Sequence, residues 1–139
     1  MGTQQLILLV LGVVIIGISI AVGIAMFNNH LVRSNRMAVI GDLTALAGVA
    51  ASYYKTPADM GGGAGIWDVD LLGPSLGHIY NPSTNSIFTE NGIYTFSSSG
   101  DLLTILGTGT EIGSNDSTNV QVSLTLTGES HELTTTVIN

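Results

Sequence analysis

The sequence predicts an α+β fold in which one long N-terminal α-helix packs against a small C-terminal antiparallel β-sheet of about four strands. Three observations support this prediction. Residues 1–27 are almost entirely apolar, residues 28–54 continue with an amphipathic pattern and no proline, and residues 93–139 alternate between apolar and polar side chains. Residues 55–92 lie between these parts and are rich in glycine, which predicts a loop region.

The apolar half of the predicted helix, residues 1–27, resembles a membrane span. No charged residue occurs before Arg33, and Leu6 to Phe27 is long enough to cross a bilayer. The positive-inside rule would place Arg33 and Arg36 in the cytoplasm, which conflicts with an external head. The conflict disappears if a short basic leader precedes Met1 in the precursor and is removed. The alternative is an ordinary single-pass anchor.

The amphipathic half, residues 28–54, carries one apolar stripe. Its apolar residues recur at spacings of three, four and seven, the pattern of one helix face. The first proline, Pro57, marks the expected stop. We therefore expect a helix from about Gly2 to Tyr54, roughly 80 Å long. The residues expected to hold the sheet are Val32, Val39, Leu43, Leu46, Ala50 and Tyr53.

The C-terminal region, residues 93–139, reads as four strands. Ile93 to Ser97 and Leu102 to Thr108 are separated by Ser-Ser-Gly-Asp, a hairpin-like turn. Val120 to Leu126 alternates apolar and polar residues, as does Leu133 to Ile138. Alternation of this kind indicates strands with one buried face, which we expect to cover the helix stripe.

The composition excludes several classes of protein. The net charge of −7 argues against nucleic acid as a partner, because neutralising phosphates requires clustered Lys and Arg. The absence of cysteine excludes disulfides, thiolate metal sites and cysteine nucleophiles. Only 9% of residues are charged, which is low for a soluble monomer. This composition favours a packed polymer or a secreted surface protein.

The sequence contains no strong motif for catalysis, phosphate binding or metal binding. The glycine-rich run Gly107 to Gly113 lacks the lysine and the following helix of a phosphate loop, so we expect a turn between strands. Glu111, Asn115 and Asp116 offer oxygen ligands for Ca²⁺ without the spacing of a known loop, and a solvated loop is the default interpretation. We expect no enzyme activity and no catalytic, cofactor-binding or metal-binding residues. The histidines, which have no partner at metal-ligand spacing, are His30, His78 and His131.

Asn115-Asp116-Ser117 is the only Asn-x-Ser/Thr sequon, because Asn81 is followed by proline. It falls in a polar segment between predicted strands. Asn115 is therefore a candidate glycosylation site, and the competing interpretation is a chance match to a short motif.

The N-terminal residues MGTQQLILLVLGVVIIGISIAVGI and the helix end Ala50-Ala51-Ser52-Tyr53-Tyr54 resemble the type IV pilin family. The resemblance implies a leader peptidase that cuts before Met1, and N-methylation of Met1. It also implies a glutamate at the fifth mature position, where this chain has Gln5. The proline that usually interrupts the apolar half is missing, so we expect a continuous helix.

By the same resemblance, the chain would be a structural subunit of an extracellular helical filament of identical subunits. The precursor would sit in the inner (cytoplasmic) membrane, and the filament would make cell-surface contacts. Two alternatives remain open, a pseudopilin or minor pilin of a secretion system and a membrane-anchored β-domain that binds a glycan or an envelope partner. The residues expected in the filament core are Gln4, Gln5, Leu6, Leu9, Val13, Ile16, Gly17, Ile20, Ala21, Ile24 and Phe27.

Overall fold

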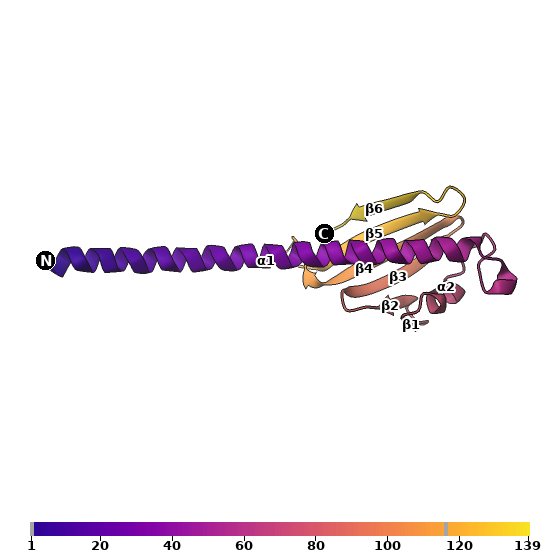
Figure 1. Cartoon of the computed structure of the whole chain (residues 1–139), viewed down its shortest axis with the longest axis horizontal. Helices are drawn as coiled ribbons and strands as arrows, with labels where there is room; N and C mark the ends of the chain where they lie inside the picture. Colours follow the sequence, from indigo (N-terminus) through magenta and orange to yellow (C-terminus); the bar gives the residue numbers. More distant parts are fainter. Residues whose placement is uncertain (1, 116) are drawn as a thin grey trace.

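The computed structural model describes residues 2–115 and 117–139. Its dominant element is α1 (Gly2–Lys55), a single α-helix of 54 residues. The first half of α1 projects from the molecule as a free rod, and the second half lies across a β-sheet (Figure 1). The helix has no break in its apolar half, which confirms the continuous helix predicted from the missing proline.

The sheet has six strands in the order β1-β2-β3-β4-β5-β6, and every neighbouring pair is antiparallel. The predicted α+β class is therefore confirmed. A 3₁₀ helix η1 (Ala58–Met60) and a short helix α2 (Val69–Ser75) connect α1 to the sheet. The strands are β1 (Ile79–Asn81), β2 (Ser86–Phe88), β3 (Gly92–Ser99), β4 (Leu102–Ile112), β5 (Asn119–Thr127) and β6 (Leu133–Val137).

The expected number of about four strands was too low, because residues 55–92 are more ordered than a loop. This segment supplies η1, α2, β1 and β2. The carboxylate of Asp68 caps α2 by accepting the backbone N–H groups of Asp70, at 3.0 Å, and Leu71, at 3.4 Å. Strands β1 and β2 have three residues each, which is too short for an alternating pattern to be recognised.

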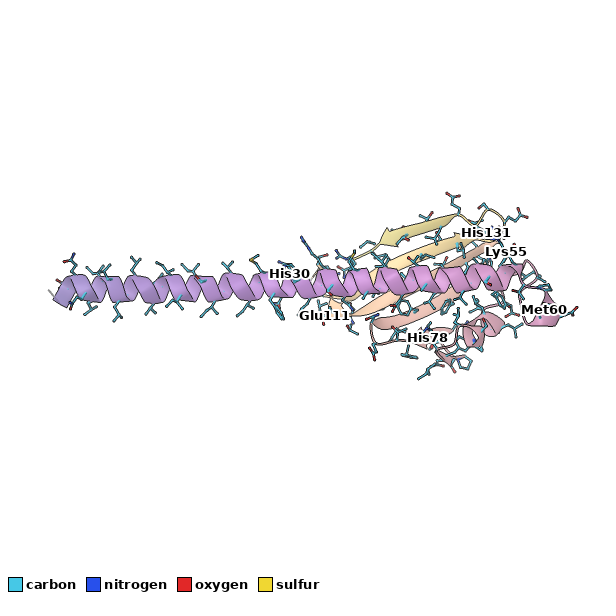
Figure 2. The ribbon with its side chains drawn as sticks, viewed as in Figure 1. His30, Lys55, Met60, His78, Glu111 and His131 are labelled. Carbon is cyan, nitrogen blue, oxygen red and sulfur yellow. The ribbon has the colours of Figure 1, made fainter. Side chains whose placement is uncertain are left out.

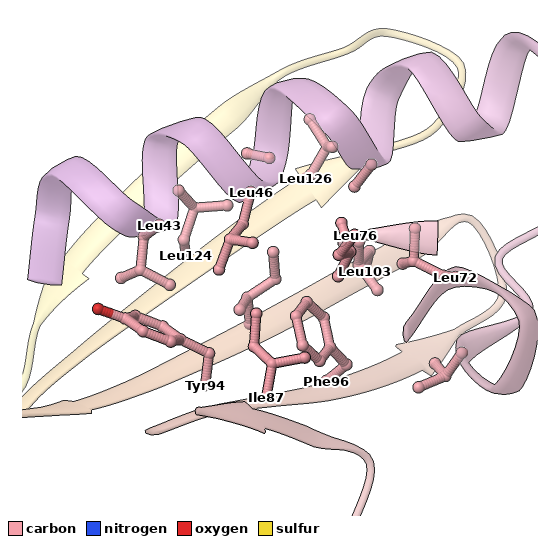
Figure 3. Packing of buried hydrophobic residues seen from close by; sticks show 14 of the residues in the cluster. Leu43, Leu46, Leu72, Leu76, Ile87, Tyr94, Phe96, Leu103, Leu124 and Leu126 are labelled. Carbon is pink, nitrogen blue, oxygen red and sulfur yellow. The ribbon is translucent and has the colours of Figure 1, made fainter. Parts of the chain in front are cut away.

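The core lies between one face of the sheet and the second half of α1 (Figure 3). Along β5 the buried residues are every second one, since successive side chains of a strand point to opposite faces. Of the six stripe residues expected on α1, five are buried, and Val32 is partly buried and packs against the same cluster. Ala47 is also buried, although the stripe omitted it.

Trp67, the single tryptophan, fastens the segment after α1 to the rest of the head. Its ring lies 4.6 Å from the ring of Tyr54, measured between centroids. Its indole Nε1 donates to the backbone oxygen of Asp101 at 3.0 Å. The side chain is buried, so its fluorescence reports on the folding of the head.

Helix α1 approaches strand β4 closely at Gly107 and Gly109. A methyl group at Gly107 would lie 2.7 Å from Val39 Cγ1 and 3.0 Å from Tyr94 Cε1. At Gly109 it would collide with the side-chain oxygen of Asn35. These two glycines therefore allow the helix to lie directly on the sheet. The expected turn over Gly107 to Gly113 was wrong in its first part, because β4 continues to Ile112 with a register irregularity after Thr108.

We expect Gly107→Ala to lower the free energy of unfolding by about 1–3 kcal/mol, because the added methyl group overpacks a stiff β-branched neighbour. The measurement is urea unfolding of the full chain in detergent, followed by Trp67 fluorescence. The matched control is Gly48→Ala on the exposed face of α1, where a methyl group meets nothing within 4 Å. An equal effect of the two substitutions would contradict the close approach of α1 to β4.

Candidate assembly surface

The apolar half of α1 makes no contact with the head and is exposed on all sides (Figure 2). Its large hydrophobic side chains from Leu6 to Phe27 are between 50% and 67% exposed. Among the described residues, α1 is the one helix that is long and apolar enough to cross a membrane. This exposed length, residues 2–27 of α1, which we call the rod, suggests membrane association or secretion, because water is an unfavourable solvent for it.

The eleven residues expected in the filament core all lie on the rod and are exposed in the single subunit. At about 100° per residue, all of them except Gln4 follow one broad face of the helix, and the other faces of this segment are apolar as well. Met1, the expected site of processing and methylation, lies outside the described residues. The exposed positions are Gln4, Gln5, Leu6, Leu9, Val13, Ile16, Gly17, Ile20, Ala21, Ile24 and Phe27.

The side chains of the rod from Leu6 to Phe27 need no hydrogen bonds from water. From Leu6 to Phe27 the one side chain with a hydrogen-bonding group is Ser19. Its hydroxyl donates to the backbone oxygen of Ile15 at 2.8 Å, within the same helix. No side chain from Leu6 to Phe27 therefore needs a partner from solvent, and burying this segment leaves no side-chain donor in it unsatisfied.

Asn35 locks the rod to the head at the point where α1 meets the sheet. Its Oδ1 accepts the backbone N–H groups of Thr110, at 3.1 Å, and Glu111, at 3.3 Å. Its Nδ2 donates to the backbone oxygen of Asn91 at 3.1 Å and to the hydroxyl of Thr110 at 3.2 Å. One amide thus joins α1 to the end of β4 and to the β2–β3 turn, which fixes the direction of the rod.

Asp42, the single acid on α1, makes a second junction. Its Oδ2 accepts hydrogen bonds from the hydroxyl of Tyr94 at 2.7 Å, from Nδ2 of Asn91 at 3.0 Å and from the hydroxyl of Thr89 at 3.1 Å. Burial acts to raise the pKa of Asp42, but these three donors outweigh it and lower the pKa below its usual value. Burial and the bond to Asp42 raise the pKa of Tyr94. No local sequence pattern indicates this cluster, because its members come from distant segments of the chain.

The Asp42 cluster predicts a dependence of stability on pH. Since the pKa of Asp42 is lowered by folding, its contribution is present above the unfolded value of about 3.9 and is lost as the pH falls through the lower folded value. We expect Asp42→Asn to destabilise the head by about 1 kcal/mol at pH 7, because the bonds to the charged carboxylate weaken.

The difference between the wild-type chain and Asp42→Asn should shrink as the pH falls below about 4. It is measured by urea unfolding in detergent at pH 7 and pH 3. A difference of the same size at both values would contradict the role given to the ionised carboxylate.

The remaining candidate residues do not form a second centre. Asn115 is exposed, and its Nδ2, the atom that would carry a glycan, donates to the hydroxyl of Thr118 at 2.8 Å. Asp116, one of the suggested Ca²⁺ ligands, lies outside the described residues. Within the described ranges, no group of three or more His, Asp or Glu side chains is arranged for a metal ion. The histidines lie far apart, on α1, before β1 and before β6, at His30, His78 and His131 (Figure 2).

A long apolar N-terminal helix that packs its second half on an antiparallel sheet is a pilin-like architecture. No protein-family model matches the chain, and neither a curated protein nor a solved structure matches it. The description of the architecture as pilin-like therefore rests on the arrangement of α1 and the sheet alone.

Proposed function

We propose that the chain is a non-catalytic structural subunit of an extracellular helical filament of the type IV pilin kind. The observation that carries this proposal is the rod, a fully exposed apolar helix locked in direction to a compact head. In the proposed assembly many identical rods pack together as the core, and the heads form the outer surface.

The size of the apolar surface supports burial by other copies. Burying one large aliphatic side chain contributes about 1.5–3 kcal/mol, and the rod exposes a long series of them. The sum reaches tens of kcal/mol, compared with about 5–15 kcal/mol for the folding of a typical domain. For a subunit outside the membrane, burial of the rod therefore contributes more free energy than the folding of the head.

The packing of rods in the proposed core also has a structural basis. Gly17, Ala21 and Ala25 follow each other at a spacing of four and form a narrow face on which helices approach closely. Gln5 takes the place of the carboxylate that the pilin resemblance implies. An uncharged amide docks by hydrogen bonds and avoids the cost of an unpaired charge in an apolar core.

The test is electron microscopy of material sheared from the cell surface, combined with mass spectrometry of its N-terminus. The proposal expects uniform filaments made of this chain, with Met1 at the processed end. A chain that stays in the membrane fraction and is extracted by detergent as a monomer would instead support a membrane-anchored binding domain.

A further inference from the structure

A groove of about 630 Å³ lies between α1 and the segment that joins β2 to β3. One wall is the exposed flank of α1 at Ala45 and Val49, and the opposite wall includes Phe88. The ionisable side chains that line it are two acids, Asp42 and Glu90, and one histidine, His78. The volume is typical of a pocket that accommodates several side-chain-sized groups.

The two acids of the groove have carboxylate oxygens that can still accept hydrogen bonds from a partner. Among the described residues, the three hydrogen bonds to Asp42 all fall on Oδ2, which leaves Oδ1 available. Glu90 is exposed at the rim. The groove therefore combines an apolar wall with negative charge, which suits a partner with a positively charged tip on an apolar stem.

The chain itself carries such a group. Of its three bases, Arg36 donates to Ser114 within the same subunit at 3.4 Å, and Lys55 ends α1. Arg33 is exposed, and it shares one flank of α1 with Met26 and His30. Residues of a helix turn by about 100° each, so Arg33 and Asp42 point to opposite flanks of α1.

We propose that the groove receives the Met26–Arg33 flank of a neighbouring subunit, with Arg33 of that neighbour beside Asp42 and Glu90. The inference rests on the proposed filament function and specifies one of its contacts. The two complementary surfaces are different and lie on opposite flanks. Such a contact is heterologous and generates an open helical polymer instead of a closed dimer.

The proposal fixes the stagger of adjacent subunits. Parallel helices bring Arg33 beside the groove, which spans Asp42 to Val49, when one is displaced by about 14 to 24 Å along its axis. In this arrangement Arg33 of each subunit offsets the acidic surface of the next head. The acidity of the heads, which have no Lys or Arg after Lys55, is then part of the assembly mechanism.

The first test exchanges charges in the full chain. Arg33→Glu and Glu90→Arg are each expected to raise the subunit concentration needed for assembly at least tenfold, and the double variant should recover most of this loss. Lys55→Glu makes the same change of charge outside the groove and should have little effect. Trp67 fluorescence in detergent checks that each head is folded. Single variants that assemble like the wild type would overturn the inference.

The second test uses the absence of cysteine from the chain. Asn29→Cys with Ala45→Cys keeps both charges and places thiols on the two proposed surfaces. A short bis-maleimide added to filaments should produce a ladder of cross-linked multimers, whereas Asn29→Cys with Thr134→Cys should not. Filaments without this ladder overturn the inference and leave the proposed function intact. A wild-type chain that forms no filaments overturns the proposed function itself.

Maleimide labelling of the single variant Ala45→Cys completes the test. We expect the thiol to be at least tenfold less reactive in filaments than in detergent-bound subunits. Equal reactivity would show that the groove is unoccupied in the filament, and would overturn the inference.

Discussion

Replacing Ile16 by glutamate is expected to abolish filament formation and to leave the head folded. Ile16 lies in the middle of the rod, is 61% exposed and has no contact with the sheet. A charged side chain at the centre of a membrane helix costs about 2.5–3.5 kcal/mol by insertion measurements. In a polymer every subunit carries this cost and also introduces a like charge beside its neighbours, so the effect multiplies along the filament.

The experiment compares wild type, Ile16→Glu and the conservative Ile16→Leu by sedimentation and electron microscopy. Ile16→Leu keeps the apolar surface and should assemble normally. Trp67 fluorescence should be the same for all three in detergent, because the rod does not contribute to the core of the head. Filaments of Ile16→Glu in normal number would contradict the burial of the rod.

Leu43→Ala is expected to produce the largest loss of head stability. Leu43 is fully buried between α1 and the sheet, near Tyr94 and Leu124 (Figure 3). Truncation of a buried leucine to alanine typically costs about 2–5 kcal/mol, from lost transfer free energy and from the cavity that remains. For a head with a stability of about 5–15 kcal/mol, this is a large fraction of the total.

Urea unfolding of the full chain in detergent, followed by Trp67 fluorescence, measures this loss. The control is Met37→Ala, which removes a side chain that is 70% exposed on the same helix and should change stability by less than about 0.5 kcal/mol. A loss below 1 kcal/mol for Leu43→Ala would contradict the packing of α1 on the sheet.

The sequence was sufficient for the long elements of the fold. The apolar stripe of α1 and the alternation along β5 each extend over several turns or residue pairs, and long periodic patterns identify an element reliably. Strands β1 and β2 were missed because each has three residues, and α2 because it has seven. Their positions depend on tertiary packing, which no local pattern encodes.

One part of the candidate assembly surface could be predicted from the sequence, and another part could not. The rod was visible in the sequence, since its apolar character is continuous. The groove and the Asp42 cluster were not, because they join α1 to residues around Thr89 and Tyr94, far along the chain. A lone acid on an amphipathic helix is usually a solvated residue. Only the fold shows that this one accepts three hydrogen bonds.

In the proposed filament, the exposed rod of one subunit is buried by the rods of others. Helical reconstruction of the native assembly by electron cryo-microscopy tests it most directly. The expected map has continuous α1 helices packed around the axis, with the six-stranded heads on the outside. A map in which the helices from Leu6 to Phe27 point into detergent or lipid, without contact between copies, would contradict it.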